Sequence, residues 1–311
     1  MKYCLLALIP AALAAQSSTV SISTDLNGNQ ITEPRTTTSK DGGVTEIKGS
    51  INGQLVPLEK NETHVLSDSP TEKVTETFDR KYDPSGQLVS VERTLTTEKK
   101  LPGGATSSSS SVSRSDVNGS MQEIERRTVE TRPAGAGATT SDVTIAKPSG
   151  NGGFETVEKQ NITTTTTAND KHQEQTVYLK STNGDFVEAR RSVEDTKKSG
   201  DKTESSQSNY EKDYTGQMTL LNQTTSVKTT SADGRQTEER NIYSSASDGV
   251  PRDEQGGQKI KEQQIIVRTP GADGSVTETV SVRRPTLADQ SHLGPATQIS
   301  QTVCTGKCTD K

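Results

Sequence analysis

Few residues in this chain have the chemistry that catalysis needs, and those few are scattered. The only histidines, His64, His172 and His292, lie far apart in sequence and in unrelated local contexts. Serine is abundant, but no Gly-x-Ser-x-Gly pattern that would expose a nucleophile surrounds any of them. The Asn- and Gly-containing stretches have too few carboxylates for a calcium loop, and they lack the lysine of a phosphate loop. We therefore expect no catalytic residue, no metal, no cofactor and no enzymatic activity.

The cysteines carry a second kind of chemistry. Cys304 and Cys308 enclose the short loop Thr305-Gly306-Lys307 near the C-terminus. In an oxidising compartment this spacing predicts a disulfide. The alternative is a metal pair, although neither a histidine nor a further cysteine lies nearby to complete a tetrahedral ligand set.

The third cysteine, Cys4, lies in an N-terminal segment that resembles a leader. Lys2 supplies an early positive charge, an apolar stretch follows from residue 5 to 13, and Ala12, Ala14 and Ala15 are small. This pattern predicts a signal peptide over residues 1–15, cleaved near Ala14 or Ala15. The apolar run is shorter than the ~20 residues of a spanning helix, so we expect an exported protein with no membrane span after cleavage. Its destination would be the periplasm, the cell surface or the medium.

Aromatic residues recur at a regular spacing. Tyr178, Tyr210 and Tyr243 follow one another at intervals of 32 and 33 residues, and Phe78 occupies the matching place in an earlier repeat. An aromatic stripe of this kind could hold sugar rings or a partner protein. Alternatively, it is a structural seam on neighbouring strands.

Composition limits what the chain can bury. Only 27% of its 311 residues are hydrophobic, 3% are aromatic, and tryptophan is absent. That is too little to fill two ordinary cores. The net charge is −5, with both signs interleaved, so nucleic acid is not an expected partner.

Glycines set the period of the chain. Turn glycines recur every 32 or 33 residues, and an apolar residue follows two positions later in the first six repeats, with another three positions further on. The glycines are Gly53, Gly86, Gly119, Gly152, Gly184, Gly216 and Gly249. The first apolar column is Leu55, Leu88, Met121, Phe154, Phe186 and Met218, and the second is Leu58, Val91, Ile124, Val157, Ala189 and Leu221.

Each repeat contains a second turn about halfway along, so it consists of two segments. The segments are rich in Thr, Ser and Val, which disfavour helix, and Asn-Gly or Asp-Gly pairs mark hairpin turns. We therefore predict an all-β fold, an elongated array of β-hairpins. Two topologies fit, a single-layer antiparallel meander and a β-solenoid.

The acidic column favours the meander. Glu92, Glu125 and Glu158 recur in register, and a solenoid would stack them about 4.8 Å apart as an unrelieved row of like charge. An antiparallel meander places a returning strand between them. Because the two apolar columns are three residues apart, either both faces carry an apolar seam or a bulge brings the columns together.

The organisation that follows has four parts. A leader covers residues 1–15, an N-terminal segment 16–43, the hairpin array 44–283, and a tail with the cysteine pair 284–311. Two apolar side chains give a unit roughly 3–6 kcal/mol, whereas ordering 33 backbones costs roughly 30–60 kcal/mol. No unit can fold alone, and neighbours must stabilise one another.

Two known groups of proteins share features with this chain. The stretch "YDPSGQL", Tyr82 to Leu88, resembles the YD repeat of the RHS family, which would imply a spiral sheet forming a shell. The polar, Thr/Lys/Glu-rich hairpin array with Gly turns is similar in architecture to the single-layer sheet of outer surface protein A of spirochaetes.

These features together predict a non-enzymatic exported scaffold of the surface, envelope or matrix that presents a polar sheet to unidentified partners. The alternative is a module that binds polysaccharide or protein through the tyrosine stripe.

Overall fold

The chain forms eighteen β-strands in the part that the structure, a computed structural model, describes: residues 15–24, 30–40, 43–51, 54–116, 118–243, 260–286 and 292–306. The strands are β1 (Ala15–Thr24), β2 (Gln30–Lys40), β3 (Val44–Ile51), β4 (Gln54–Asp68), β5 (Glu72–Tyr82), β6 (Leu88–Lys100), β7 (Thr106–Ser115), β8 (Met121–Pro133), β9 (Ala138–Pro148), β10 (Phe154–Thr166), β11 (Asp170–Lys180), β12 (Phe186–Ser199), β13 (Lys202–Lys212), β14 (Met218–Thr230), β15 (Gln236–Tyr243), β16 (Ile260–Pro270), β17 (Val276–Arg283) and β18 (Thr297–Gly306). A single 3₁₀ turn, η1 (Pro102–Gly104), follows β6. Within these described ranges, no helix is long and apolar enough to cross a membrane.

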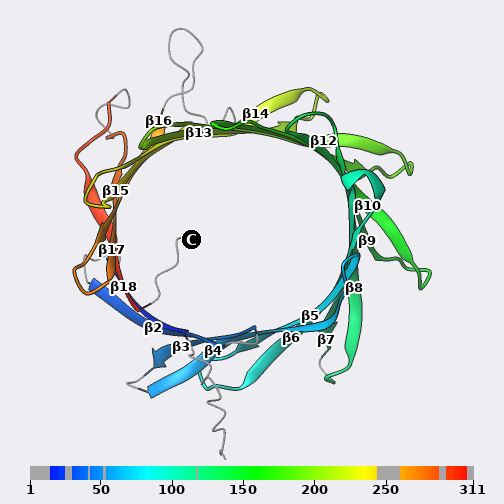
Figure 1. Ribbon diagram of the computed structural model, residues 1–311, viewed down its shortest axis with the longest axis horizontal. Coiled ribbons are helices and arrows are strands. Elements are labelled where there is room, and N and C mark those ends of the chain that lie inside the picture. The colour runs from blue at the N-terminus through cyan, green and yellow to red at the C-terminus, as the bar shows by residue number, and fades with distance from the viewer. Residues whose placement is uncertain are drawn as a thin grey trace, which may run out of the picture.

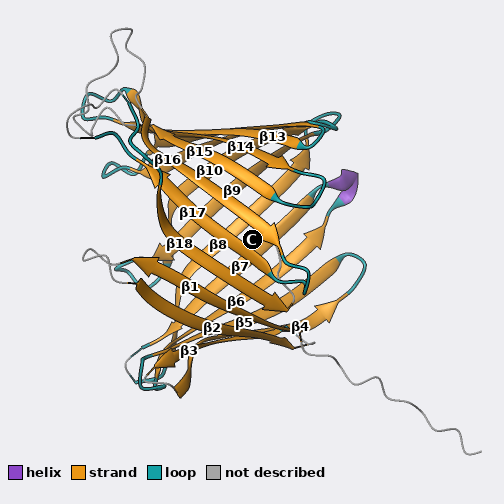
Figure 2. Cartoon of the chain, turned by 90° about the vertical axis from the view of Figure 1, so that its left-hand side faces the viewer, coloured by secondary structure: helices purple, strands orange, loops and turns teal. Residues whose placement is uncertain are grey.

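Consecutive strands pair antiparallel, and the last strand pairs with the first. In the closing ladder, Ser23 of β1 stands opposite Ser300 of β18, and Ser17 stands opposite Gly306. Figure 1 shows the resulting ring in end view, and Figure 2 shows its tilted strands from the side. The predicted antiparallel meander is confirmed, and the solenoid alternative is wrong. The elongated open array is also wrong, because the sheet closes on itself.

Closure includes both ends of the described chain. β1 and β2 belong to the segment 16–43 and β18 belongs to the tail 284–311, yet all three pair within the same sheet. The predicted boundaries at residues 43 and 283 therefore mark no break in the hydrogen-bonded ladder. The predicted leader up to residue 14 lies outside the described residues.

Five of the periodic glycines, Gly86, Gly119, Gly152, Gly184 and Gly216, lie within the described turns that join odd-numbered strands to even-numbered ones; Gly53 and Gly249 lie outside the described residues. In the turn after β5, the Gly86 N–H donates to the Asp83 carbonyl at 2.9 Å, and the Asp83 N–H donates to the Gln87 carbonyl at 2.8 Å. Gly86 has φ of 81°, the left-handed region that glycine adopts without a Cβ clash. The Asp83 carboxylate accepts the Ser85 hydroxyl and the Ser85 and Gln87 N–H groups. These bonds lower the pKa of Asp83, the Ser85 hydroxyl most of all, followed by the Gln87 N–H. Turn geometry therefore explains the glycine period.

The second apolar column marks β-bulges. The pairing register skips a residue in each even-numbered strand from β4 to β18, and in five of these strands a skipped residue belongs to the second column. These residues are Leu58, Ile124, Val157, Ala189 and Leu221; in β6 the skipped residue is Val89. A bulge bends its strand and increases the local twist. Bulges in every even-numbered strand from β4 to β18 therefore curve the sheet, which is the physical reason why a ring forms where a flat array was predicted.

The register also sorts the strand residues into two faces, because direct cross-strand partners point to the same side of a sheet. One face contains Val143, Val177, Ile266 and Val282, the four buried apolar side chains of the described chain. Side chains converge on the concave side of a curved sheet, so this crowded face is the inner one. We call it the lumen face and its opposite the outer face.

Backbone chirality gives the same assignment. Thr63 lies on the face that contains the four buried residues, and its N–H donates to the Gly43 carbonyl, toward β3. Even-numbered strands run toward the viewer of Figure 1, and the strand order runs counterclockwise there. In an L-residue, the direction of the strand and the direction of its N–H together fix the side of the sheet on which the side chain lies. Here the strand runs toward the viewer and the N–H points toward β3, so the Thr63 side chain points into the ring.

Candidate functional site

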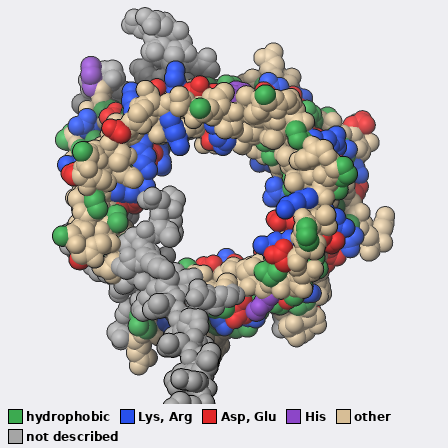
Figure 3. Space-filling model, viewed as in Figure 1, with side chains coloured by type: hydrophobic (Ala, Val, Ile, Leu, Met, Phe, Trp, Pro, Cys, Tyr) green, Lys and Arg blue, Asp and Glu red, His purple; other side chains and the backbone are tan. Residues whose placement is uncertain are grey.

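The hollow of the barrel is lined by charged and amide side chains. On the lumen face, Arg114 donates to Glu92 at 2.8 Å, and Arg268 lies 2.6 Å from Glu278. Arg190 lies 3.5 Å from Glu158 on the same face. Figure 3 shows Lys and Arg side chains around the rim of the hollow. The predicted acidic column Glu92, Glu125 and Glu158 therefore lines the lumen, where returning strands separate its members.

The outer face is also charged. Arg93 donates to Glu76 at 2.7 Å, and His172 lies 2.6 Å from Asp195. Arg126 donates to Glu123 at 2.8 Å. The Arg126 guanidinium, followed by the Ser111 hydroxyl, lowers the pKa of Glu123 from 4.5 to about 2. Both walls of the barrel therefore carry paired ions.

Two basic residues of the outer face contact the following repeat. The Arg126 guanidinium lies 4.0 Å from the centre of the Phe154 ring, and the Lys159 ammonium lies 4.3 Å from the Phe186 ring. In both pairs, the cation of one repeat covers the first-column residue of the next repeat. Such contacts are worth about 0.5–1 kcal/mol at exposed sites. The same cation–ring contact therefore joins two successive pairs of neighbouring hairpins.

The tyrosine stripe lies on the outer face. Tyr178, Tyr210 and Tyr243 belong to β11, β13 and β15, so one strand separates each tyrosine from the next. All three side chains are half-buried. By register, Tyr178 stands opposite Glu188 and Tyr210 stands opposite Arg191. The sequence predicted the stripe, whereas its position on the outside follows from the register.

The histidines do not form a common site. His64 contacts the Phe78 ring edge-on, with 6.4 Å between ring centres, and His172 pairs with Asp195. His292 lies beyond β17, in the segment that leads to β18. No cluster of three or more metal-ligating side chains occurs among the described residues.

The structure describes only one of the two cysteines of the predicted disulfide. Cys304 lies on β18 and is disulfide-bonded. Cys308 lies outside the described residues, so its pairing with Cys304 stays a prediction.

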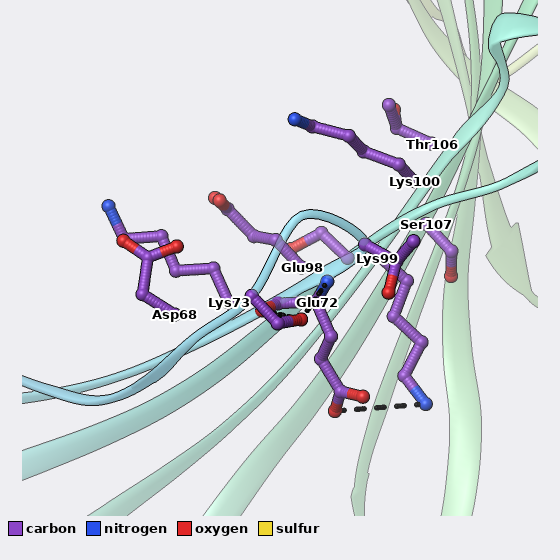
Figure 4. A pocket seen from close by; sticks show the side chains of 11 residues that line it. Asp68, Glu72, Lys73, Glu98, Lys99, Lys100, Thr106 and Ser107 are labelled. Atoms are coloured by element: carbon purple, nitrogen blue, oxygen red, sulfur yellow. Dashed lines mark hydrogen bonds and ion pairs between the residues drawn. The ribbon is translucent and has the colours of Figure 1, made fainter.

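Two clefts lie at the ends of the strands. One, of about 360 Å³, is formed by the ends of β4 and β6 and the starts of β5 and β7. Figure 4 shows its charged lining, with Asp68 and Lys73 to the left, Lys100 above and the Glu72–Lys99 ion pair (3.9 Å) below. The other, of about 540 Å³, includes His172 and Asp195. Sequence reasoning missed both clefts because their walls come from different hairpins.

Comparison with known proteins gives a fold. No protein-family profile matches the chain, and no curated protein matches its sequence. A mutant of the Rh. blastica porin matches with a TM-score of 0.53 at 8% identity, over 94% of this chain and 98% of the porin. Salmonella typhi OmpF in complex with daunomycin matches with a TM-score of 0.54 at 8% identity, over 95% and 98%. The chain has a porin-type fold.

This result corrects both resemblances drawn from the sequence. The neighbours in structure are outer-membrane porins, and the YD-repeat and outer surface protein A interpretations are wrong. "YDPSGQL" is a hairpin turn with Gly86 in the left-handed region, a geometry that recurs at Gly119, Gly152, Gly184 and Gly216. Turn chemistry that many β-proteins share produced the likeness.

Proposed function

We propose that this protein is an exported, non-enzymatic hollow barrel of the cell envelope that takes hydrophilic solutes into a water-filled lumen. The observation that carries this proposal is the closed sheet with ion pairs on its inner wall, such as Arg114–Glu92. A flat scaffold, the function expected from the sequence, is not consistent with a sheet that closes.

The lumen is wide. Eighteen strands, spaced about 4.8 Å apart and tilted by about 40°, give a backbone diameter of roughly 36 Å. Side chains reduce the open width to roughly 20 Å. Because the lumen carries both Arg and Glu in pairs, we expect little discrimination by charge among the solutes that enter.

The outer wall determines the surroundings of the barrel. A barrel that spans lipid presents an apolar band about 25 Å tall, and an arginine or lysine on that band costs about 2–4 kcal/mol near the bilayer midplane, with a smaller cost for Asp and Glu. Here Glu76, Arg93, Glu123 and Arg126 are all on the outer face. We therefore place the barrel in a hydrated layer of the envelope, with water against both walls.

A second candidate is a channel that spans the outer membrane. It is favoured by the match to porins over 94% of the chain. The two candidates differ in solubility, since only a lipid-spanning channel would need detergent to stay in solution.

Two adjacent serines in β7 allow a matched test of the lumen. Ser110 is on the lumen face, and Ser109 is on the outer face. Each substitution is made in the chain of residues 16–311. We expect a small maleimide to label the new cysteine in both the Ser110→Cys and the Ser109→Cys variant. A maleimide on a large polyethylene glycol should label the Ser109→Cys variant much faster. Equal rates with the large reagent would contradict an enclosed lumen.

Solubility separates the two candidates. We expect a monodisperse protein without detergent and no stepwise conductance when it is added to planar bilayers. Aggregation without detergent, together with stable conductance steps after reconstitution, would favour the membrane channel and overturn the hydrated setting.

A further inference from the structure

We propose that the outer wall carries a binding platform for a single chain of an uncharged polysaccharide, formed by Tyr178, Tyr210 and Tyr243. The proposal rests on the hydrated setting proposed above, because the three rings on the outer wall must meet solvent, and solubility without detergent tests that setting separately. It follows from the positions of the three rings and from the charges between them.

The rings form a regular ladder. Two strand spacings separate successive tyrosines, and on β12 the partners of Tyr178 and Tyr210 are Glu188 and Arg191, three residues apart with the bulge at Ala189 between them. Neighbouring rings are therefore about 12 Å apart along a diagonal of the sheet. The same step recurs on β14, where Tyr210 stands opposite Leu220 and Tyr243 stands opposite Gln223. A spacing of this order brings a ring under roughly every second unit of an extended sugar chain.

Polar side chains lie between the rings. Arg191 and Glu188 occupy β12, and Gln223 and Thr225 occupy β14, all on the outer face. Sugars are recognised by aromatic surfaces for their C–H faces together with hydrogen-bonding groups for their hydroxyls. The ladder supplies both kinds of group in alternation.

The charges in the ladder favour an uncharged chain. Arg191 lies 2.8 Å from Glu188 and 3.7 Å from Glu174, so its charge is already compensated. Lys159, opposite Tyr178, lies over the Phe186 ring. An anionic polysaccharide would have to displace the glutamates from Arg191 or the Phe186 ring from Lys159. The hydroxyls of a neutral polysaccharide could accept hydrogen bonds from these cations while the existing contacts stay in place.

The curvature of the wall selects a flexible chain. Eighteen strands form the full circle of the barrel, so neighbouring strands are about 20° apart around its axis. Four strand spacings separate Tyr178 from Tyr243, so the three tyrosines span roughly 80° of the wall. A flat crystalline fibre would meet only the middle ring. A soluble chain can follow the wall and contact all three.

Glycan binding by residues 16–311 tests the proposal, with soluble neutral glucans and mannans, acidic polysaccharides and crystalline cellulose as probes. We expect binding to at least one soluble neutral polysaccharide, and a loss of at least about tenfold in affinity in the Tyr178→Ala/Tyr210→Ala variant. Tyr214→Ala is the matched control, because Tyr214 is fully exposed on the turn after β13 and is not paired in the sheet with the three rings. It should bind as the unmodified protein does. Tyr210→Phe should also bind, since it keeps the ring.

Several outcomes would overturn the proposal. These are no binding to any neutral polysaccharide, binding to acidic chains alone, and an equal loss in the Tyr214→Ala control. Circular dichroism checks that the double variant folds; if it does not, the single Tyr243→Ala variant must still weaken binding, and unchanged affinity there also refutes the ladder.

Discussion

A disulfide across the closing seam would test the ring directly. Ser23 of β1 and Ser300 of β18 are direct partners in the ladder, and facing residues in antiparallel strands have Cα atoms about 4.5–5.5 Å apart, within the range that a disulfide bridges. Changing both to cysteine replaces one small side chain by another of similar shape. We expect the bond to form spontaneously under oxidising conditions and to be identified by peptide mapping without reduction.

The stabilisation should be large because the two residues are far apart in sequence. Their separation is 300 − 23 = 277 residues, for which chain entropy gives about 5.6 kcal/mol. With an unfolding entropy of about 2.1 cal/mol/K per residue, this raises the melting temperature by at most about 9 °C relative to the reduced variant. Differential scanning calorimetry with and without reductant measures the shift.

A control pair of cysteines shows whether bond formation is specific to the seam. Ser23→Cys combined with Ser141→Cys, on β9 at another part of the ring, should not form a bond. In an open sheet of eighteen strands, β1 and β18 would lie roughly 80 Å apart. Absence of the Ser23–Ser300 bond in folded protein would therefore refute closure, and the lumen with it.

Two further predictions concern a turn and an ion pair. Gly137 has φ of 73°, and a Cβ there would lie 2.4 Å from the Thr166 carbonyl oxygen, whereas Gly119 has φ of 82° with open space around it. Gly137→Ala should therefore lower the free energy of unfolding clearly more than Gly119→Ala, whose cost is the backbone term of about 1–2 kcal/mol; equal costs in urea melts would contradict the close approach. For the ion pair, the folded-state pKa of Glu123 is about 2, below its ordinary 4.5, chiefly because of Arg126. Its stabilising contribution is thus complete above about pH 4.5 and is lost as the pH falls toward about 2. Glu123→Gln should unfold at lower urea concentration than the unmodified protein at pH 7, with the difference shrinking through this window; a difference that persists unchanged at pH 2 would show that the ion pair is not its cause.

Much of the architecture can be predicted from local signals. Glycines every 32 or 33 residues with Asn-Gly and Asp-Gly pairs predicted hairpins, and Thr- and Ser-rich segments predicted strands. The acidic column, represented by Glu92 and Glu125, predicted antiparallel pairing because it needed intervening strands. Each of these signals acts within one repeat or between adjacent repeats, so the sequence contains it directly.

The candidate site could be predicted only in part from the sequence. The spacing of Tyr178, Tyr210 and Tyr243 predicted that they share a row, but both walls of this barrel are polar, so no hydrophobic contrast tells which wall carries them. The contact of Arg126 with Phe154 was also missed, because it joins residues 154 − 126 = 28 positions apart in different hairpins.

The sequence by itself determined the hairpin module, its period and its antiparallel order. The tertiary structure alone decided that the array closes into a ring, and hence that it has an inside and an outside. Closure depends on the summed curvature of the bulges, such as those at Ile124 and Val157, and on the pairing of β1 with β18. A single hairpin looks the same in a flat sheet and in a barrel, so no local pattern distinguishes them.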